Sequence, residues 1–210
     1  MQTTTIDLLR HGECEGGHVY RGRLDFALNE KGWQQLRSKT HDIDVWTQVV
    51  SSPLQRCAKF ADEVAQRCCK PLTVMDGFRE LDFGDWEGRL IDEVWREQGS
   101  DVRRFFADPI NAAPPNGEPM VDFETRVVTA WKLLLQSMRG EHVLLVIHGG
   151  TIRVLLAHLL AMPLARIANL EVPYASVSRI CIHHREGHPD FSTLVFHNGF
   201  LGSDVRGEYR

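Results

Sequence analysis

The sequence predicts an α/β fold, a three-layer α/β/α sandwich whose central sheet is mostly parallel. Residues 143–147 (Val-Leu-Leu-Val-Ile) form a continuous apolar run of strand length, which is typical of a parallel strand covered on both faces. Such runs alternate along the chain with segments whose apolar residues recur at helical spacing. The 210 residues suffice for one well-buried α/β domain and are too few for two, so we expect a single domain over residues 1–210.

The first half of the chain alternates strand-like and helix-like segments. They are, in order, residues 4–10 (strand), 29–39 (helix), 45–51 (strand), 53–68 (helix) and 71–78 (short strand). Ser51-Ser52-Pro53 indicates the start of the second helix, because a serine hydroxyl caps free backbone N–H groups and proline fits a first helical turn. Apolar residues at helical spacing after Pro53 predict that this helix packs against the sheet.

A segment of different character lies between about residues 80 and 140. It contains three of the five tryptophans, a Phe-Phe pair and a turn-rich stretch from Asp108 to Pro119. We expect this segment to form a small inserted helical cap over the rim of the sheet. An apolar stripe at helical spacing predicts that a long helix, roughly residues 121–138, closes it.

The chain then returns to the sheet and ends in a hairpin. After residues 143–147, apolar residues from Ile152 to Leu160 recur at helical spacing, and this helix should stop near Pro163. Two final apolar runs, residues 177–183 and 191–197, flank a turn-forming stretch and are predicted to pair as antiparallel strands.

Composition narrows the function classes. The formal net charge of -4 and a pI near 6.2 give no global positive field for nucleic acid or an anionic membrane surface, so neither partner is expected. The five cysteines lack disulfide-like or zinc-like spacing, which favours reduced thiols. No segment approaches the roughly 20 apolar residues that a membrane helix needs, and no signal peptide is indicated, so we expect a cytoplasmic protein.

Two histidines, each followed by glycine, stand at the ends of two predicted strands. Arg10-His11-Gly12-Glu13 ends the first strand, and His148-Gly149-Gly150 follows residues 143–147. Open α/β sheets bind ligands at the carboxyl ends of their strands, so both imidazoles should lie at one rim. The glycines permit close backbone approach, and a helix starting just beyond would offer N–H groups to an anion. Together these features indicate a phosphate site.

The residues at this rim meet the requirements of phosphoryl transfer, namely a nucleophile, positively charged donors and a proton for the leaving oxygen. A neutral imidazole can attack phosphorus, and like-charge repulsion from Arg10 favours the neutral form of His11. Arginine can bind phosphate through two charge-assisted hydrogen bonds, and Arg10 and Arg56 are the candidates. The chain has no P-loop and no convincing carboxylate cluster, so we expect neither a metal nor a cofactor.

Four motifs, in order, make the chain resemble the histidine phosphatase superfamily, whose fold is phosphoglycerate mutase-like. They are Arg10-His11-Gly12-Glu13, Ser51-Ser52-Pro53-Leu54-Gln55-Arg56, Glu80-Leu81-Asp82-Phe83-Gly84-Asp85-Trp86-Glu87-Gly88 and His148-Gly149-Gly150. The set covers residues 10–150 and is far more specific than any one of its members. The resemblance implies a phosphorylated small molecule as substrate.

The resemblance also implies catalytic roles for two residues. His11 would be the nucleophile that becomes phosphohistidine. Glu80 would protonate the leaving alkoxide and later help activate the hydrolytic water, with Asp82 and Asp85 as competing proton donors. The residues expected to bind substrate are Arg10, Arg56, His148, Arg21, Gly22 and Gly149.

The chain departs from the family pattern at two positions near the nucleophile. Cys14 stands where Thr or Ser is frequent, and Gly17 stands where Asn is frequent. A side-chain contact to phosphate would then be missing, and Arg21 or backbone N–H groups would substitute for it. An electropositive pocket could also lower the pKa of the Cys14 thiol, with simple packing as the alternative reading.

A narrower resemblance comes from residues 114–118 (Pro-Pro-Asn-Gly-Glu), followed by Phe123 and Arg126. This pattern is similar to the α-ribazole phosphatase branch, which acts in assembling the nucleotide loop of cobalamin. We therefore expect a metal-independent phosphomonoesterase that acts on α-ribazole 5′-phosphate. Two alternatives are a phosphoglycerate mutase-like phosphotransferase, disfavoured by the short cap, and a phosphohistidine-directed regulatory or binding protein.

Aromatic residues of the cap allow two readings. They could line a pocket for a flat base such as benzimidazole, or they could form ordinary cap core. The residues concerned are Trp86, Trp95, Phe105, Phe106 and Trp131.

Overall fold

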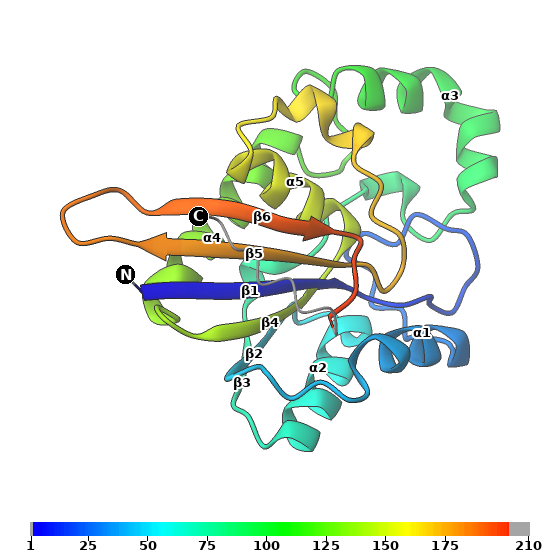
Figure 1. Ribbon diagram of the computed structural model, residues 1–210. Coiled ribbons are helices and arrows are strands. Elements are labelled where there is room, and N and C mark those ends of the chain that lie inside the picture. Colours follow the sequence, from blue (N-terminus) through cyan, green and yellow to red (C-terminus); the bar gives the residue numbers. More distant parts are fainter. Residues whose placement is uncertain (1, 202–210) are drawn as a thin grey trace.

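A six-stranded sheet forms the centre of the computed structural model, which describes residues 2–201 (Figure 1). In spatial order its strands are β3 (Leu72–Val74), β2 (Gln48–Ser51), β4 (His142–Ile147), β1 (Gln2–Arg10), β5 (Val177–His184) and β6 (Phe191–His197). The strands from β3 to β1 pair in parallel, and β5 runs antiparallel to both β1 and β6. The predicted mostly parallel sheet and the predicted C-terminal hairpin are confirmed. Residues 1 and 202–210 of the expected domain lie outside the described part.

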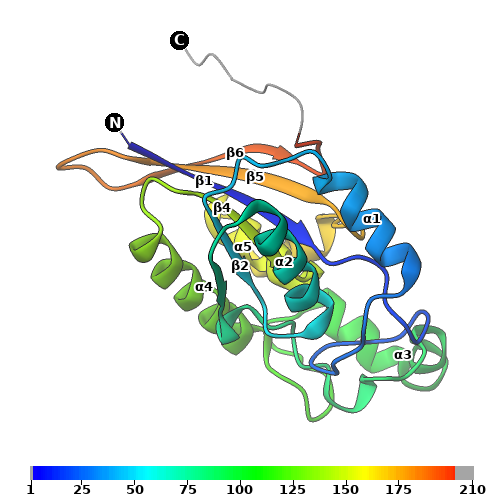
Figure 2. The same cartoon turned by 90° about the horizontal axis from the view of Figure 1, so that it is seen from below.

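Helices cover both faces of the sheet, which confirms the predicted sandwich (Figure 2). α1 (Glu30–Thr40) and α2 (Gln55–Cys68) share one apolar core with the strands, and α4 (Met120–Ser137) and α5 (Gly149–Leu159) share the other. α3 (Ile91–Ala107) lies apart from the sheet, near the end of the molecule to which β1 points. Short 3₁₀ helices occupy Asp76–Phe78, Gly84–Trp86 and Leu164–Asn169. Within residues 2–201, no helix combines the length and apolar character needed to cross a membrane.

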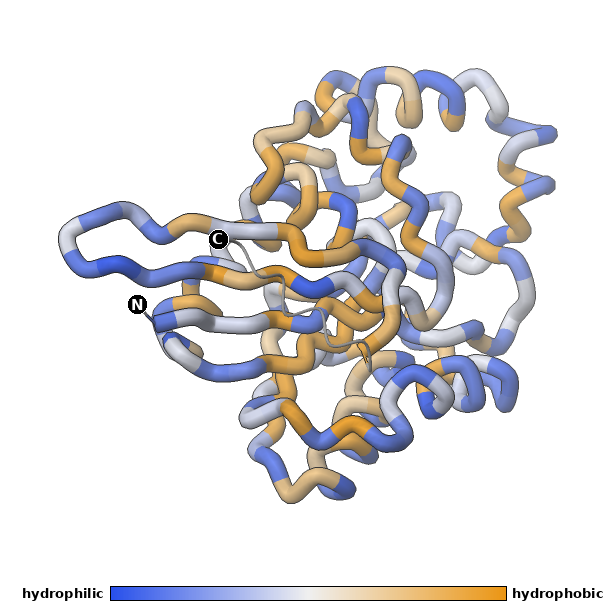
Figure 3. The backbone as a smooth tube through the Cα atoms, in the orientation of Figure 1, coloured by the Kyte–Doolittle hydropathy of each residue, from blue (hydrophilic) through white to orange (hydrophobic). Residues whose placement is uncertain are grey.

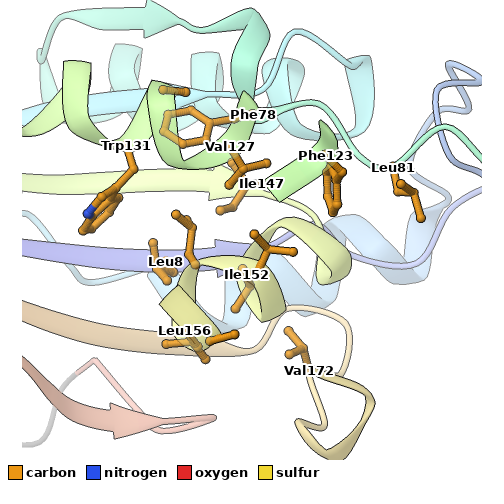
Figure 4. Packing of buried hydrophobic residues seen from close by; sticks show 14 of the residues in the cluster. Leu8, Phe78, Leu81, Phe123, Val127, Trp131, Ile147, Ile152, Leu156 and Val172 are labelled. Carbon is orange, nitrogen blue, oxygen red and sulfur yellow. The ribbon is translucent and has the colours of Figure 1, made fainter. Parts of the chain in front are cut away.

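Alternation of side chains along the strands builds the two cores. Ile6 and Leu8 of β1 belong to the core under α4 and α5, whereas Leu9 belongs to the core under α1 and α2. Figure 4 shows Leu8 together with Trp131 of α4 and Ile152 of α5. Hydrophobic residues follow the central strands, and the turn between β5 and β6 is hydrophilic (Figure 3). The central strands are therefore packed on both faces, and their ends carry the loops of the rim.

The predicted serine cap of α2 is wrong. The helix begins at Gln55, and the residue before it, Leu54, makes no side-chain cap. The hydroxyl of Ser52 accepts a hydrogen bond from the N–H of Leu54 at 3.3 Å and lies 2.7 Å from Nε2 of His148. A tertiary contact has therefore taken the hydroxyl that the local pattern assigned to the helix.

Two strands are shorter than predicted. β2 starts at Gln48 and not at residue 45, because Trp46 turns its buried side chain toward β1 and donates a hydrogen bond to Asp7 at 2.9 Å. β3 ends at Val74, and the chain turns there into a 3₁₀ helix that buries Phe78.

Residues 80–140, the expected insertion, contain two helices with different surroundings. α3 lies away from the sheet. α4 packs on the sheet beside α5, and its Val127, Trp131 and Leu134 share a core with Ile6 of β1. The helix that the sequence assigned to closing the cap therefore packs on the sheet.

Asp7 of β1 is a fully buried carboxylate with four donor atoms around it. Oδ1 accepts from Nε of Arg179 at 2.7 Å, and Oδ2 accepts from Nη2 of Arg179 at 3.0 Å and from the Trp46 indole, with Nε2 of His142 at 2.9 Å. Burial alone would raise the pKa of Asp7, but the hydrogen bonds and charges of His142 and Arg179 outweigh burial and lower it. The network ties β1 to β4, β5 and the segment before β2.

Asp7→Asn is expected to lower the free energy of unfolding by about 3 kcal/mol at pH 7, because Arg179 loses its buried charge partner. The folded pKa of Asp7 lies below its ordinary value, so this stabilisation is present at neutral pH and is lost as the pH falls through the folded pKa. Urea unfolding at pH 7 and in acid should show a difference from wild type that narrows in acid.

The matched control for this prediction is Glu63→Gln, which breaks the more exposed ion pair with Arg37 and should cost less than about 1 kcal/mol. Equal losses for the two variants at pH 7 would contradict the structural importance of Asp7.

Candidate active site

Parallel pairing of β1 with β4 brings His11 and His148 together. Arg10 lies opposite Ile147 in the register, and the N–H of His11 donates to the carbonyl of Ile147 at 2.9 Å. The two imidazole rings lie 5.3 Å apart between centroids, at 62° to each other. Both side chains are buried.

The ring of His11 is held in one orientation by its own loop. Nδ1 lies 2.8 Å from the carbonyl oxygen of Gly12, so its N–H donates there and Nε2 is left as the nitrogen with the free lone pair. Gly12 has no room for a side chain, because a Cβ would stand 2.2 Å from the carbonyl oxygen of Gly32 in α1. Burial, followed by the charges of Arg56 and Arg10, lowers the pKa of His11 well below its usual value. His11 is therefore neutral at physiological pH.

His148 is also neutral, and its tautomer is fixed by two partners. Its Nδ1 accepts from Nε of Arg56 at 3.2 Å, so the proton sits on Nε2, which donates to the hydroxyl of Ser52 at 2.7 Å. Burial, and then the charges of Arg56, His11 and Arg10, lower the pKa of His148 well below its usual value.

Arg56 reaches the rim from the first turn of α2 and is fully buried. Its Nη1 and Nη2 donate to the carbonyl oxygens of Leu24, at 2.8 Å, and Gly22, at 2.6 Å. Gly22 has a φ of +42°, and a Cβ there would lie 1.9 Å from Oε1 of Glu87. Glu87 in turn accepts the N–H groups of Arg23 and Leu24, so a glycine and a carboxylate set the loop that holds Arg56.

Arg10 and Arg21 present further guanidinium groups to the same cavity. Arg10 stacks over the Tyr174 ring at 4.2 Å and donates through Nη1 to the carbonyl of Val172. Arg21 donates through Nη2 to the carbonyls of residues 14, 15 and 17 and through Nη1 to the Tyr174 hydroxyl at 3.3 Å. The Nε–H groups of Arg10 and Arg21 are buried and have no acceptor within the described residues. Unpaired buried donors beside two imidazoles favour an anion.

Glu80 faces the N-terminus of α5. Its carboxylate accepts backbone N–H groups from Gly150 at 2.9 Å, Thr151 at 3.2 Å and Leu81 at 3.1 Å. Gly150 is required for this approach, because a Cβ there would stand 2.4 Å from Oε1 of Glu80. Gly149, the first residue of α5, lines the cavity beside Arg10.

The two competing proton donors face other partners. Asp82 pairs with Arg23 at 3.2 Å, and Asp85 accepts from the side-chain amide of Asn116 at 2.9 Å. Glu80 lines the cavity, whereas Asp82 and Asp85 are not among the residues that line it. Of these three carboxyl groups, Glu80 is therefore the one that can meet a molecule inside the cavity.

The cavity has a volume of about 380 Å³ and two chemically distinct ends. One end carries His11, four arginines and Glu80, whereas His148 is not among the residues that line the cavity. The other is lined mostly by apolar side chains, among them Leu81, Phe83, Ile91, Phe105, Phe106, Pro109, Met120, Phe123, Leu164 and Ile167. A phosphoryl group suits the first end, and an apolar or aromatic leaving group suits the second.

The cap aromatics divide between the two readings made from the sequence. Phe105 and Phe106 line the cavity, and Trp95 stacks on Phe106 with the rings nearly parallel. Trp86 and Trp131 are buried in the apolar core and do not line the cavity.

Several cavity or supporting residues escape prediction from the sequence. Tyr174 and Arg153 line the cavity, and so does His18; Ser52 binds His148 from behind. Arg153 could have been predicted from its position, because it lies one turn into the helix that follows His148, and side chains there tilt toward the helix start at the rim. Tyr174 lies in a loop before β5 and carries no local signal.

Cys14 does not behave as an activated thiol. Its side chain is buried, with Sγ 3.6 Å from Nδ1 of His11, and burial raises its pKa despite the charges of Arg56 and Arg21. Packing is the reading that the structure supports. Within the described residues, no group of three or more histidine, cysteine or acidic side chains is placed to hold a metal ion.

Two buried imidazoles and four arginines at the carboxyl ends of parallel strands define a phosphate-handling α/β protein. The sequence profile of the histidine phosphatase superfamily (branch 1) matches residues 6–194, and the chain belongs to this family. It is therefore a phosphatase or mutase of that superfamily that acts on a phosphorylated substrate.

Known proteins similar to this chain carry different names. The protein named Probable phosphoglycerate mutase GpmB of Citrobacter koseri is 33% identical over 182 residues, which cover 83% of each chain. The α-ribazole phosphatase of Shigella flexneri is 26% identical with a TM-score of 0.76, covering 93% of this chain and 96% of that one. A mycobacterial glucosyl-3-phosphoglycerate phosphatase, solved in complex with VO3, is 27% identical with a TM-score of 0.80, covering 90% and 96%. All three names are those of enzymes that handle a phosphate group, and they differ in the substrate that they mention.

The lowered pKa values of His11 and His148 predict that neither ring titrates near the usual histidine midpoint. Both rings should stay neutral as the pH falls through about 6.5, because burial disfavours the charged ring and protonation would add a positive charge beside Arg56 and Arg10. Nitrogen NMR of histidine-labelled protein, with His11→Gln and His148→Gln to assign the signals, should show two midpoints well below that value. The urea-unfolded protein serves as the reference, and a normal midpoint for His11 in the folded state would refute the prediction.

Proposed function

We propose that this protein is a metal-independent phosphomonoesterase that works through a phosphohistidine at His11. The observation that carries the proposal is the state of that imidazole, which is buried, neutral and tied through Nδ1 to Gly12. Nε2 is the nitrogen left for attack on phosphorus. The guanidinium groups of Arg10, Arg21 and Arg56 supply the positive charge that the phosphoryl oxygens need in the transition state.

The proposed reaction has two steps. Nε2 of His11 forms a bond to phosphorus while the bond from phosphorus to the ester oxygen breaks, and Glu80, which enters this step as the neutral carboxylic acid, gives its proton to the departing oxygen. Water then attacks the phosphohistidine, Glu80 takes a proton from that water, and the bond from phosphorus to Nε2 breaks. Inorganic phosphate and an alcohol leave, and both residues return to their starting states.

The proposed substrate is α-ribazole 5′-phosphate. Three observations support it: the Pro-Pro-Asn-Gly-Glu motif of residues 114–118, the likeness to the Shigella flexneri enzyme, and the apolar end of the cavity with Phe105 and Phe106 in its wall. A benzimidazole is flat and apolar and could lie against such aromatic side chains.

Arg153 favours a second candidate, a phosphomonoester that carries a carboxylate. Its Nε donates to the carbonyl of Leu170 at 2.8 Å, and no carboxylate within the described residues lies at ion-pair distance from its terminal nitrogens. Two of the similar proteins are named for phosphoglycerates. A mutase would use the same phosphohistidine and return the phosphoryl group to such a substrate.

A panel of phosphate esters without added metal tests reaction and substrate together. We expect phosphate release from p-nitrophenyl phosphate, a higher kcat/KM for α-ribazole 5′-phosphate than for 3-phosphoglycerate or phosphoserine, and no effect of EDTA. Faster turnover of the carboxylated esters, with selective loss in Arg153→Gln, would favour the second candidate. Transfer that outruns release in a coupled mutase assay would overturn the phosphatase proposal, and no release from any ester would indicate a binding protein.

His11→Ala is expected to abolish phosphate release, a loss of at least about 10³-fold in kcat, while far-UV circular dichroism and the melting temperature stay near those of the wild type. Cys69→Ser, at an exposed site on the distant end of α2, is the control and should keep full activity. Substantial turnover by His11→Ala would remove the proposed nucleophile.

Glu80→Gln tests the proton donor. We expect a loss of about 10²-fold or more in kcat for an alkyl phosphate and a much smaller loss for p-nitrophenyl phosphate, whose leaving group needs no proton. Glutamine keeps one acceptor for the N–H groups of α5 and so preserves the loop. Equal losses on the two substrates would assign proton donation to another group.

A further inference from the structure

The motif of residues 114–118 and Arg126 lie outside the cavity wall, yet their side chains meet behind the loop that carries Glu80. Neither Glu118 nor Arg126 lines the cavity. Both side chains are mostly buried, with exposures of 19% and 26%. Their contacts converge on the backbone of residues 77–82.

Arg126 of α4 uses all three guanidinium nitrogens. Nε and Nη2 donate to the two carboxylate oxygens of Glu118 at 3.0 and 2.8 Å, a bidentate pair. Nη1 donates to the carbonyls of Gly77 at 3.0 Å and Arg79 at 3.1 Å, and Nη2 reaches the carbonyl of Glu80 at 3.4 Å. One side chain therefore satisfies three carbonyl groups immediately around Glu80.

Glu118 binds the same loop through the backbone of Asp82. Its N–H donates to the carbonyl of Asp82 at 2.9 Å, and its Oε2 accepts the N–H of Asp82 at 3.4 Å. Gly117 permits this contact, because a Cβ there would stand 2.6 Å from the carbonyl oxygen of Asp82. The motif is thus a turn that packs closely against the loop beginning with Glu80.

The carboxylate of Glu80 depends on this backbone position. It accepts N–H groups from Gly150 and Thr151, at the start of the helix that directly follows His148. Thr151 adds a hydroxyl contact to the carbonyl of Arg79 at 3.3 Å. A loop free to move by about 1 Å would place the carboxyl group out of line with the ester oxygen, an error that can cost about 10²-fold in rate.

We infer that Arg126, oriented by Glu118, is a positioning residue for proton donation by Glu80. The inference rests on the proposed function, in which Glu80 protonates the leaving oxygen. It assigns a physical task to the Pro-Pro-Asn-Gly-Glu motif that is separate from substrate contact. A merely structural pair would affect all substrates alike, whereas a pair that acts through Glu80 affects only reactions that need the proton.

The experiment compares Arg126→Gln with wild type on an alkyl phosphate and on p-nitrophenyl phosphate. We expect kcat to fall about 10- to 100-fold on the alkyl ester and less than about threefold on the aryl ester, with KM little changed on both. Arg126→Lys keeps the charge without the fork and should recover part of the alkyl ester rate. Lys132→Gln removes a charge from an exposed position of the same helix and should leave both rates unchanged.

A double variant separates action through Glu80 from a general effect. In a Glu80→Gln background, Arg126→Gln should cause no further loss on the alkyl ester, because the group that it positions is gone. Additive losses, or equal losses of the single variant on both esters, would overturn the inference. If Arg126→Gln fails to fold by circular dichroism, Glu118→Gln gives the same comparison with a smaller expected loss of about 3- to 10-fold.

Failure of the inference is distinguishable from failure of the proposed function. A selective loss in Glu80→Gln without one in Arg126→Gln leaves the proton donor in place and removes only the positioning role. Equal losses on both esters in Glu80→Gln remove the proton donor and the positioning role together.

Discussion

Parallel pairing of β1 with β4 is the contact on which the site depends. The register that sets Arg10 opposite Ile147 delivers His11 and His148 to one rim, and the two apolar cores bury residues 6–9 of β1 and 143–147 of β4. The surroundings of the two imidazoles then determine their protonation state. Burial and the charge of Arg56 keep both imidazoles neutral. In the proposed reaction, this one buried guanidinium makes the nucleophile available and supplies charge for the phosphoryl oxygens.

Three carboxylates in the rim loops accept hydrogen bonds from backbone N–H groups. Glu80 accepts N–H groups at the start of α5, Glu87 accepts those of the loop around Gly22, and Glu118 links Asp82 to Arg126. Each carboxylate joins two segments that are distant in sequence, which gives irregular loops the satisfied hydrogen bonds that helices and strands have by geometry. The rim is therefore preorganised before a substrate arrives, which is the property that electrostatic catalysis needs.

The sequence was sufficient for the fold class and for the positions of the main strands and helices, because strand-length apolar runs and helical periodicity are local signals. The strand ends and the family motifs also predicted that one site contains His11, Arg56, Glu80 and His148. Local rules failed where a tertiary partner competed for the same group. Ser52 was predicted as a cap and binds His148. Asp7 draws its partners from positions as distant as Arg179, and no local pattern encodes such a network.

The most direct measurement is the position of phosphorus on the enzyme during turnover. Protein mixed with substrate, quenched in alkali within milliseconds and digested should carry one phosphoryl group, on Nε2 of His11, as shown by mass spectrometry and phosphorus NMR of the labelled peptide. The adduct should be absent from His11→Ala and should accumulate when Glu80→Gln slows attack by water. Phosphorus on another side chain, on Nδ1 of His11, or on no residue during active turnover would contradict covalent catalysis at this histidine.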